Sequence, residues 1–128
     1  MKKTFYIATS FGNSGQAEEL AGYLESKGMR WVYGHDWTKS TGTDQGDADA
    51  SSKAQRDLQS AVAADVFILL LKSPLTVGCH SEMGARVTAN KEAHLIRQGV
   101  EDWHLFHSHP GVIEHRDIDS FMRTVFSA

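Results

Sequence analysis

The sequence predicts an α/β fold in which a parallel β-sheet lies between two layers of helices. Apolar runs typical of strands alternate along the chain with segments of helical periodicity. Residues 66–71 are apolar at every position, as expected of a strand that is covered on both faces. The 128 residues are 41% hydrophobic and 23% charged, which suits an ordinary globule, so we expect residues 1–128 to form a single domain.

The first half of the chain predicts two strands, one helix and a long loop. Residues 4–8 and 30–33 are the strands. Between them, apolar residues recur at i, i+3, i+4 and i+7 on one helical face that ends at Gly28. These residues are Ala17, Leu20, Ala21 and Leu24. Residues 34–50 are polar, contain three glycines and show no period, which predicts a long loop of the kind that often carries function.

The second half predicts three helices and three strands. The strands are residues 66–71, 93–96 and 103–107, and a loop with Pro74 and Gly78 follows the first of them. The apolar faces of the three helices consist of Ala54, Leu58, Ala61 and Val62, then Met83, Val87 and Asn90, and finally Ile118, Phe121, Met122 and Val125.

This order of elements predicts where a ligand would bind. Right-handed crossovers between parallel strands leave few topologies. In open sheets of this kind, ligands bind beyond the carboxyl ends of the strands. The loops at residues 9–14, 34–50 and 73–81 are expected at that edge.

Composition excludes several classes of function. The net charge of −3, with no cluster of Lys or Arg, is untypical of proteins that bind nucleic acid or an anionic membrane. One cysteine, Cys79, cannot form an internal disulfide and favours a cytoplasmic setting. The apolar runs are too short for a secretion signal or a membrane span. No Walker loop or GxGxxG motif occurs, so we expect no ATP or NAD cofactor.

Two carboxylates stand where a purely structural helix does not need them. Asp57 falls within the apolar stripe of the second helix, where burial would be costly, although a position at the wet rim of the stripe explains it equally well. Glu82 is expected in the first turn of the third helix, where the helix dipole favours the ionised form. There it could act as a covalent nucleophile, or serve only to stabilise the helix.

Taken in order, these segments resemble the nucleoside 2-deoxyribosyltransferase family. The shared pattern is an Asp-Leu helix that ends in Ala-Asp, a buried strand, a glycine-bearing loop, and Glu-Met-Gly at the start of a helix. Here it runs from Asp57 to Asp65 and from Gly78 to Gly84. The opening strand, Phe-Tyr-Ile-Ala-Thr-Ser at residues 5–10, is also similar, and the resemblance spans most of residues 4–96.

The resemblance implies a flavodoxin-like fold, with five parallel strands in the order 2-1-3-4-5 and helices on both faces. It also implies cleavage of the N-glycosidic bond of a nucleoside or nucleotide, with the sugar passed to water or to another base. By this resemblance Glu82 attacks the anomeric carbon, Asp57 helps to protonate the leaving base, and Tyr6 orients the nucleophile. An oxocarbenium-like transition state needs such a carboxylate and such a proton.

One departure from the transferase pattern points to a phosphate. Transferases of the family often carry Asp six positions before the nucleophile, where this chain has Thr76. A related branch, the deoxynucleoside 5′-monophosphate N-hydrolases, has a hydroxyl residue there that holds phosphate, and Ser10 and Gly78 match other phosphate contacts of that branch. Hydroxyls and a glycine amide are suitable phosphate donors. An ordinary loop threonine is the equally open alternative.

The remaining expectations concern ligands and partners. Trp37 could stack on a base or pack on the rim of the site. His104, His107 and His109 cluster in sequence, but with one cysteine we expect no metal site, and Cys79 reads as a pocket wall. We expect a homodimer or larger, with residues 107–115 near the interface, because a chain this short has little wall to enclose a nucleotide. The alternative function is a non-catalytic nucleotide-binding module.

Overall fold

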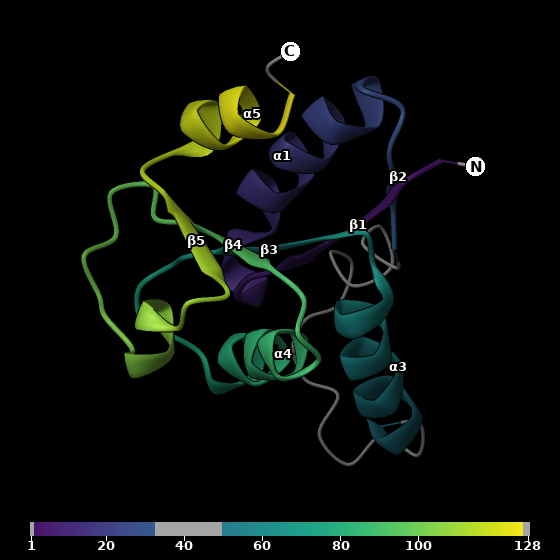
Figure 1. Ribbon diagram of the computed structural model, residues 1–128, viewed down its shortest axis with the longest axis vertical. Helices are drawn as coiled ribbons and strands as arrows, with labels where there is room; N and C mark the ends of the chain where they lie inside the picture. Colours follow the sequence, from purple (N-terminus) through teal and green to yellow (C-terminus); the bar gives the residue numbers. More distant parts are fainter. Residues whose placement is uncertain (1, 33–49, 127–128) are drawn as a thin grey trace.

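The computed structural model describes residues 2–32 and 50–126, and five parallel strands within these ranges form one sheet (Figure 1). The strands are β1 (Thr4–Ala8), β2 (Arg30–Trp31), β3 (Val66–Leu70), β4 (Ala93–Ile96) and β5 (Val112–His115). Their spatial order is β2-β1-β3-β4-β5, and each neighbouring pair is parallel. The predicted α/β class and strand order are confirmed.

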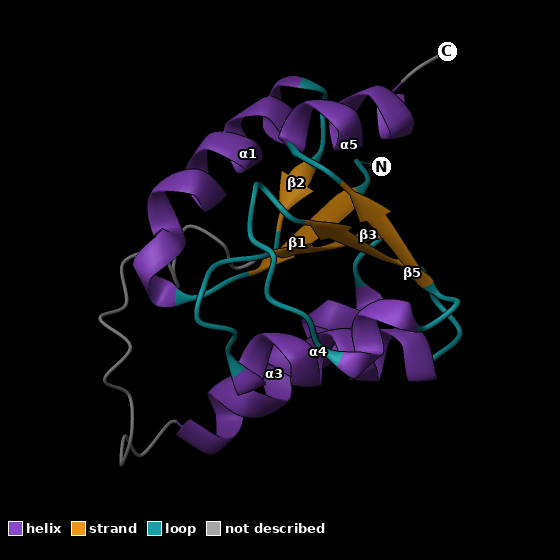
Figure 2. Cartoon of the chain, turned by 90° about the vertical axis from the view of Figure 1, so that its left-hand side faces the viewer, coloured by secondary structure: helices purple, strands orange, loops and turns teal. Residues whose placement is uncertain are grey.

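Helices cover both faces of this sheet (Figure 2). One layer consists of α1 (Ser14–Ser26) and α5 (Ile118–Phe126), and the other of α3 (Ala50–Ala63) and α4 (Val77–Thr88). Two short 3-10 helices, η1 (Phe11–Asn13) and η2 (Leu105–Ser108), lie in the connections. The predicted helical face of α1 is fully buried, and Gly28 follows the helix with φ of 86°, a conformation that glycine adopts without strain.

The alternation of side chains along the strands divides the core in two. On β1, Phe5 and Ile7 pack with α1 and α5, whereas Tyr6 and Ala8 face α3 and α4. The central strand β3 contributes to both clusters, with Phe67 on one face and Ile68 on the other, so the predicted burial of its two faces is confirmed. Tyr6 is therefore placed beneath the helix layer that carries Asp57 and Glu82.

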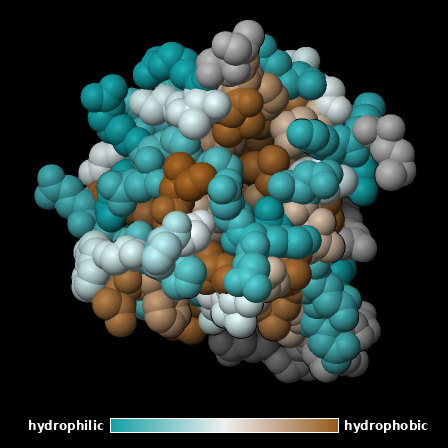
Figure 3. Space-filling view, viewed as in Figure 1, coloured by the Kyte–Doolittle hydropathy of each residue, from teal (hydrophilic) through white to brown (hydrophobic). Residues whose placement is uncertain are grey.

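The predicted fifth strand was wrong. Residues 103–107 overlap η2 instead, and β5 is Val112–His115, paired with β4 from Ala93 to Ile96. Apolar character misled the prediction, because Trp103, Leu105 and Phe106 are exposed rather than buried in the sheet. Figure 3 shows hydrophobic surface at its lower left, on the side where Figure 1 draws η2 in yellow-green.

Smaller corrections concern the helix boundaries and faces. On α3 only part of the predicted stripe is buried, since Ala54 and Leu58 are exposed, whereas Ala61 and the neighbouring Ser60 are buried. On α4, the expected face ends at Val87, because Asn90 lies beyond the helix, is exposed and has φ of 61°.

The second strand is also shorter than predicted, ending at Trp31 within the described residues. The predicted loop at residues 34–50 lies outside them, apart from its last residue, which begins α3. Among the described helices, none has both the length and the apolar character needed to cross a membrane.

Candidate active site

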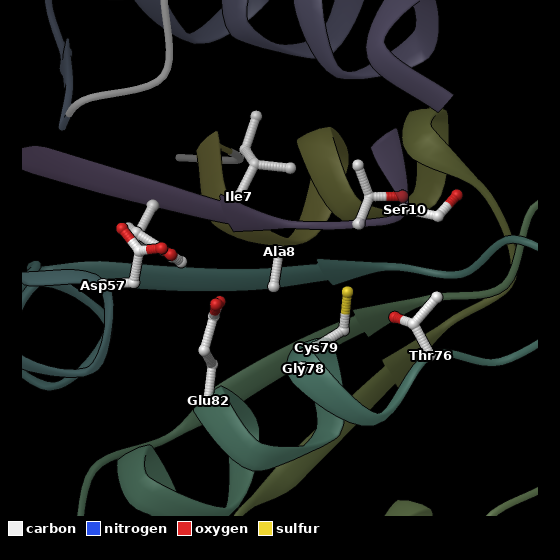
Figure 4. A pocket seen from close by; sticks show the side chains of 10 residues that line it. Ile7, Ala8, Ser10, Asp57, Thr76, Gly78, Cys79 and Glu82 are labelled. Atoms are coloured by element: carbon white, nitrogen blue, oxygen red, sulfur yellow. The ribbon is translucent and has the colours of Figure 1, made fainter. Parts of the chain in front are cut away.

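A pocket of about 360 Å³ opens at the carboxyl end of β1 (Figure 4). Ligand binding is predicted from the sequence at this same edge of the sheet. The lining residues are Tyr6, Ile7, Ala8, Thr9, Ser10, Asp57, Thr76, Gly78, Cys79 and Glu82. Every predicted site residue that lies in the described part of the chain is among them, and Trp37 lies outside that part. The volume is within the range of small-molecule sites.

The loop after β1 is held rigidly by side chains that the sequence did not single out. The Thr9 hydroxyl donates to the carbonyl oxygen of Leu70 at 2.6 Å, which ties the loop to the end of β3. The side-chain amide nitrogen of the buried Asn13 donates to the hydroxyl oxygen of Thr9 at 3.1 Å. These bonds fix the backbone at Ser10, one of the expected phosphate ligands.

Glu82 is largely desolvated, and burial raises the pKa of its carboxyl group to about 8. The expected position in the first turn was wrong, because α4 begins at Val77 and places Glu82 in its second turn, where the helix dipole contributes little. A hydrogen bond from the Tyr6 hydroxyl acts to lower the Glu82 pKa, and the charge of Asp57 acts to raise it. The free protein therefore holds a proton on Glu82 at neutral pH.

Tyr6 stays protonated throughout the accessible pH range. Burial first, and then the neighbouring charges of Glu82 and Asp57, raise the pKa of its hydroxyl far above the ordinary value. The protonated hydroxyl donates to the Glu82 carboxyl group, and this bond favours the ionised form of Glu82.

Asp57 is half-buried on α3, between the two alternatives that the sequence left open. Its side chain is 41% exposed, and its carboxyl oxygen lies 3.5 Å from the guanidinium of Arg56. Desolvation raises the pKa of Asp57, while the charges of Arg56 and Lys53 oppose that rise. Asp57 and Glu82 are thus two carboxyl groups of unequal burial that face one pocket, an arrangement suited to acid–base work.

The opposite end of the pocket is built by the start of α4. Thr76 is the N-cap residue of α4, yet its hydroxyl makes no capping bond to a backbone N–H group. Gly78 lies in the first turn, where backbone N–H groups have no partners within the helix. Burial raises the pKa of Cys79 to about 11, so this residue is a neutral pocket wall, as predicted, and not an activated thiolate.

The side chains form a row across the pocket. Figure 4 shows Asp57 at one end and Thr76 at the other, with Glu82 and Cys79 between them, rising from α4 toward β1. Acidic groups therefore occupy one end and hydroxyl and backbone N–H donors the other. This polarity matches a ligand with a basic ring at one end and an anion at the other.

Arg86 is a residue that sequence reasoning missed. Its buried guanidinium donates to carbonyl oxygens at the end of α3, namely those of Ala61, Val62, Ala64 and Asp65, and to that of Glu92. Arg86 lies one turn after Glu82 on α4, and Ala61 lies one turn after Asp57 on α3. The clamp thus sets the relative position of the two helices that carry the carboxyl groups.

The histidines do not form a metal centre in the part of the chain that is described. No group of three His, Cys, Asp or Glu side chains there could hold an ion. His107 instead pairs with His80, and His94 pairs with His115, in both cases at 2.9 Å between ring nitrogens. A lone histidine gives no sequence signal for such a pair, because its partner is distant along the chain.

Comparison with known proteins supports the fold. No family model matches the sequence, and no curated protein matches it either. Among solved structures, the chain is similar to the CMP N-glycosidase BcmB of Clostridium botulinum, with a TM-score of 0.66 and 18% sequence identity. The match covers 96% of this chain and 98% of that one. At this identity the likeness shows a shared fold.

Proposed function

We propose that the protein is an enzyme that cleaves the N-glycosidic bond of a nucleoside 5′-monophosphate. The observation that carries the proposal is the polarity of the pocket, with two carboxyl groups of raised pKa at one end and hydroxyl and N–H donors at the other. A bound nucleotide would place its base near Asp57, its sugar over Glu82 and its phosphate near Thr76 and Gly78. A neighbour of the same fold is a CMP N-glycosidase, which agrees with this class of substrate.

In the proposed reaction the proton that Glu82 holds in the free protein passes to Asp57 when the substrate binds. The Glu82 carboxylate then attacks the anomeric carbon while the bond to the base breaks. The base leaves with the bonding electrons and takes a proton from Asp57, which yields a glycosyl ester on Glu82. Water, or a second base, then attacks the same carbon, and the ester C–O bond breaks to restore the carboxylate. The proton of the attacking water passes to Asp57.

The burial of Glu82 serves this chemistry. A desolvated carboxylate is unfavourable in the free protein, which is why its pKa is raised. The oxocarbenium-like transition state brings positive charge beside it and stabilises the ionised form, so the interaction is strongest where the barrier is highest.

The direct test is incubation with a panel of nucleosides and their 5′-monophosphates, with release of free base followed by chromatography. Base release from a monophosphate, with little from the matching nucleoside, is the expected result. Binding of the monophosphates without any base release would favour the alternative of a non-catalytic nucleotide-binding module.

Association of copies into a dimer stays a prediction, to be measured by sedimentation.

The rate is expected to fall at alkaline pH. Near neutral pH Asp57 and Glu82 together hold a proton, and the leaving base needs it. Above the Glu82 pKa of about 8 the pair loses that proton, so kcat/KM should drop by about tenfold per pH unit. Initial rates from pH 7 to 10 measure this alkaline fall in kcat/KM. The phosphate group of the substrate is fully ionised over most of this range, so its titration does not contribute. A rate that still rises at pH 10 would contradict a proton shared by these carboxyl groups.

Thr76→Ala is expected to raise KM for a 5′-monophosphate by about tenfold or more, because a hydrogen bond to a charged group contributes about 1.5–3 kcal/mol. KM for the matching nucleoside should change by less than about twofold. The Thr76 hydroxyl makes no capping bond, so the helix should lose little stability. Steady-state kinetics on the two substrates check this, and an equal change in both would assign Thr76 to the loop alone.

A further inference from the structure

A buried pair of histidines lies directly behind the Thr76 end of the pocket. His80, on the first turns of α4, and His107, in η2, are 5% and 6% exposed, and their Nε2 atoms are 2.9 Å apart. The Nδ1 atom of His80 lies 2.9 Å from the carbonyl oxygen of Thr76. The proposed reaction does not use either ring. Burying polar groups is costly unless they are hydrogen-bonded, so a buried pair beside the pocket calls for a structural or functional explanation.

The neighbours of the pair allow one arrangement of its protons. The Thr76 carbonyl can only accept, so we assign the proton of His80 to Nδ1, which leaves its Nε2 as an acceptor. The Nδ1 atom of His107 faces two donors, the backbone N–H of His104 at 3.2 Å and the Arg97 guanidinium at 3.4 Å. It must therefore be unprotonated, and the Nε2–H group of His107 donates to His80.

These bonds form a continuous chain from the sheet to the pocket. Arg97, just after β4, is anchored by Glu114 of β5 at 2.9 Å and by the carbonyl oxygens of Val100 and Asp102. It contacts His107, which donates to His80, which in turn donates to Thr76. The carbonyl of the N-cap residue is thereby fixed relative to the carboxyl edge of the sheet.

The pair acts by geometry rather than by charge. Burial lowers the pKa of His80 and, together with the charges of His80, Arg97 and His104, lowers the pKa of His107 to about 4, with Glu114 opposing. The charge of His104 also lowers the His80 pKa. A second proton on His80 would place its Nε2–H group against the Nε2–H group of His107. A second proton on His107 would place its Nδ1–H group against the backbone N–H of His104. Near neutral pH neither ring attracts phosphate.

We propose that His80 and His107 are positioning residues that hold Thr76 and the first turn of α4 in place for the phosphate of the substrate. This inference rests on the proposed function for the identity of the ligand. The hydroxyl of Thr76 and the N–H groups of the first turn can converge on an anion only if the N-cap backbone is fixed. His80 fixes it through the Thr76 carbonyl, while the Thr76 hydroxyl bonds to the Cys79 thiol within the pocket lining and lies where a ligand can reach it.

The test measures binding by calorimetry in the Glu82→Gln background, in which turnover does not interfere. The probes are the common nucleoside 5′-monophosphates and their nucleosides, and the tightest pair is used. His80→Leu should weaken binding of the monophosphate by about tenfold and of the nucleoside by less than about twofold. His80→Asn, whose amide nitrogen can take the place of Nδ1, should restore most of the loss.

A second histidine pair, of which one ring is buried and the other half-buried, supplies the matched control. His115 is 5% exposed and its Nε2 lies 2.9 Å from Nδ1 of His94, beside Phe121 in the other helix layer. His115→Leu also removes a buried histidine from a hydrogen-bonded pair, so it should lower the thermal midpoint without changing the ratio of the two dissociation constants. Thermal midpoints of all variants show whether each is folded.

Three outcomes would overturn the inference. They are an equal loss of monophosphate and nucleoside binding in His80→Leu, no loss at all, or a parent protein that binds the monophosphate no more tightly than the nucleoside. Failure of the proposed function has a different signature: wild-type protein that binds the monophosphate and releases no base. In that case the effect of His80→Leu on binding still decides the role of the pair.

Discussion

Glu82→Gln is expected to lower the rate of base release by about three orders of magnitude or more. The amide keeps the shape of the side chain and removes the attacking electron pair, so the covalent route is lost. Binding should survive, because the Tyr6 hydroxyl and the rest of the pocket are unchanged. Single-turnover release of base from the best substrate of the panel measures the effect.

Asp57→Asn is the matched comparison that separates a nucleophile from a general acid. The raised pKa of Glu82 would also suit a general acid, because a buried carboxyl group that keeps its proton can donate it to a leaving group. A substrate with a less basic leaving group needs little protonation, so it should rescue Asp57→Asn and not Glu82→Gln. Rescue of Glu82→Gln alone would exchange the two roles, and full activity of Glu82→Gln would exclude a catalytic role for this residue.

The stability of Glu82→Gln is the control that separates loss of activity from loss of fold. The Glu82 pKa of about 8 in the folded protein lies above its ordinary value, so the folded state binds more protons than the unfolded state between these two values. Its contribution to stability is fully present below the ordinary pKa and is lost as the pH rises through 8. Glutamine does not titrate, so the variant should gain stability over wild type across this interval, as chemical denaturation at pH 5 and pH 9 can show.

Arg86→Met is expected to lower the free energy of unfolding by about 3–5 kcal/mol. The substitution keeps most of the apolar volume and leaves carbonyl groups at the end of α3 without their donor, several of them buried. Arg86→Lys should recover only part of the loss, because a single ammonium group cannot donate to several carbonyl oxygens in the planar geometry of a guanidinium. Equilibrium unfolding in urea measures both variants.

Lys91 provides the control for this prediction. Its exposed ammonium donates to the carbonyl oxygen of Val62 at 2.8 Å, at the same helix end that Arg86 clamps. Lys91→Met removes one exposed bond and should cost less than about 1 kcal/mol. Equal losses in the Lys91 and Arg86 variants would mean that the buried clamp contributes no more than a surface contact.

Hydrophobic periodicity by itself determined the class of the fold and the edge of the sheet at which the pocket opens. Periods of two and of 3.6 residues specify which faces must be buried, and so the helical face of α1 and the doubly covered β3 could be read from their residues. The alternation of elements then fixed a parallel sheet with loops at its carboxyl edge. Thr76, Gly78 and Glu82 come soon after the predicted central strand, whereas the family resemblance was needed to bring Asp57 to the same site, and all four line the pocket.

Only the tertiary structure decided properties that depend on contacts between distant segments. The pKa of Glu82 reflects burial beneath β1, and the fifth strand was decided by pairing with β4, not by the apolar residues within the strand predicted at 103–107. Arg86 and His80 are ordinary helix residues in the sequence, and they gain partners at Ala61 and His107 only when the chain is folded. Local sequence records which face of an element is apolar, whereas desolvation and hydrogen bonding depend on what that face meets.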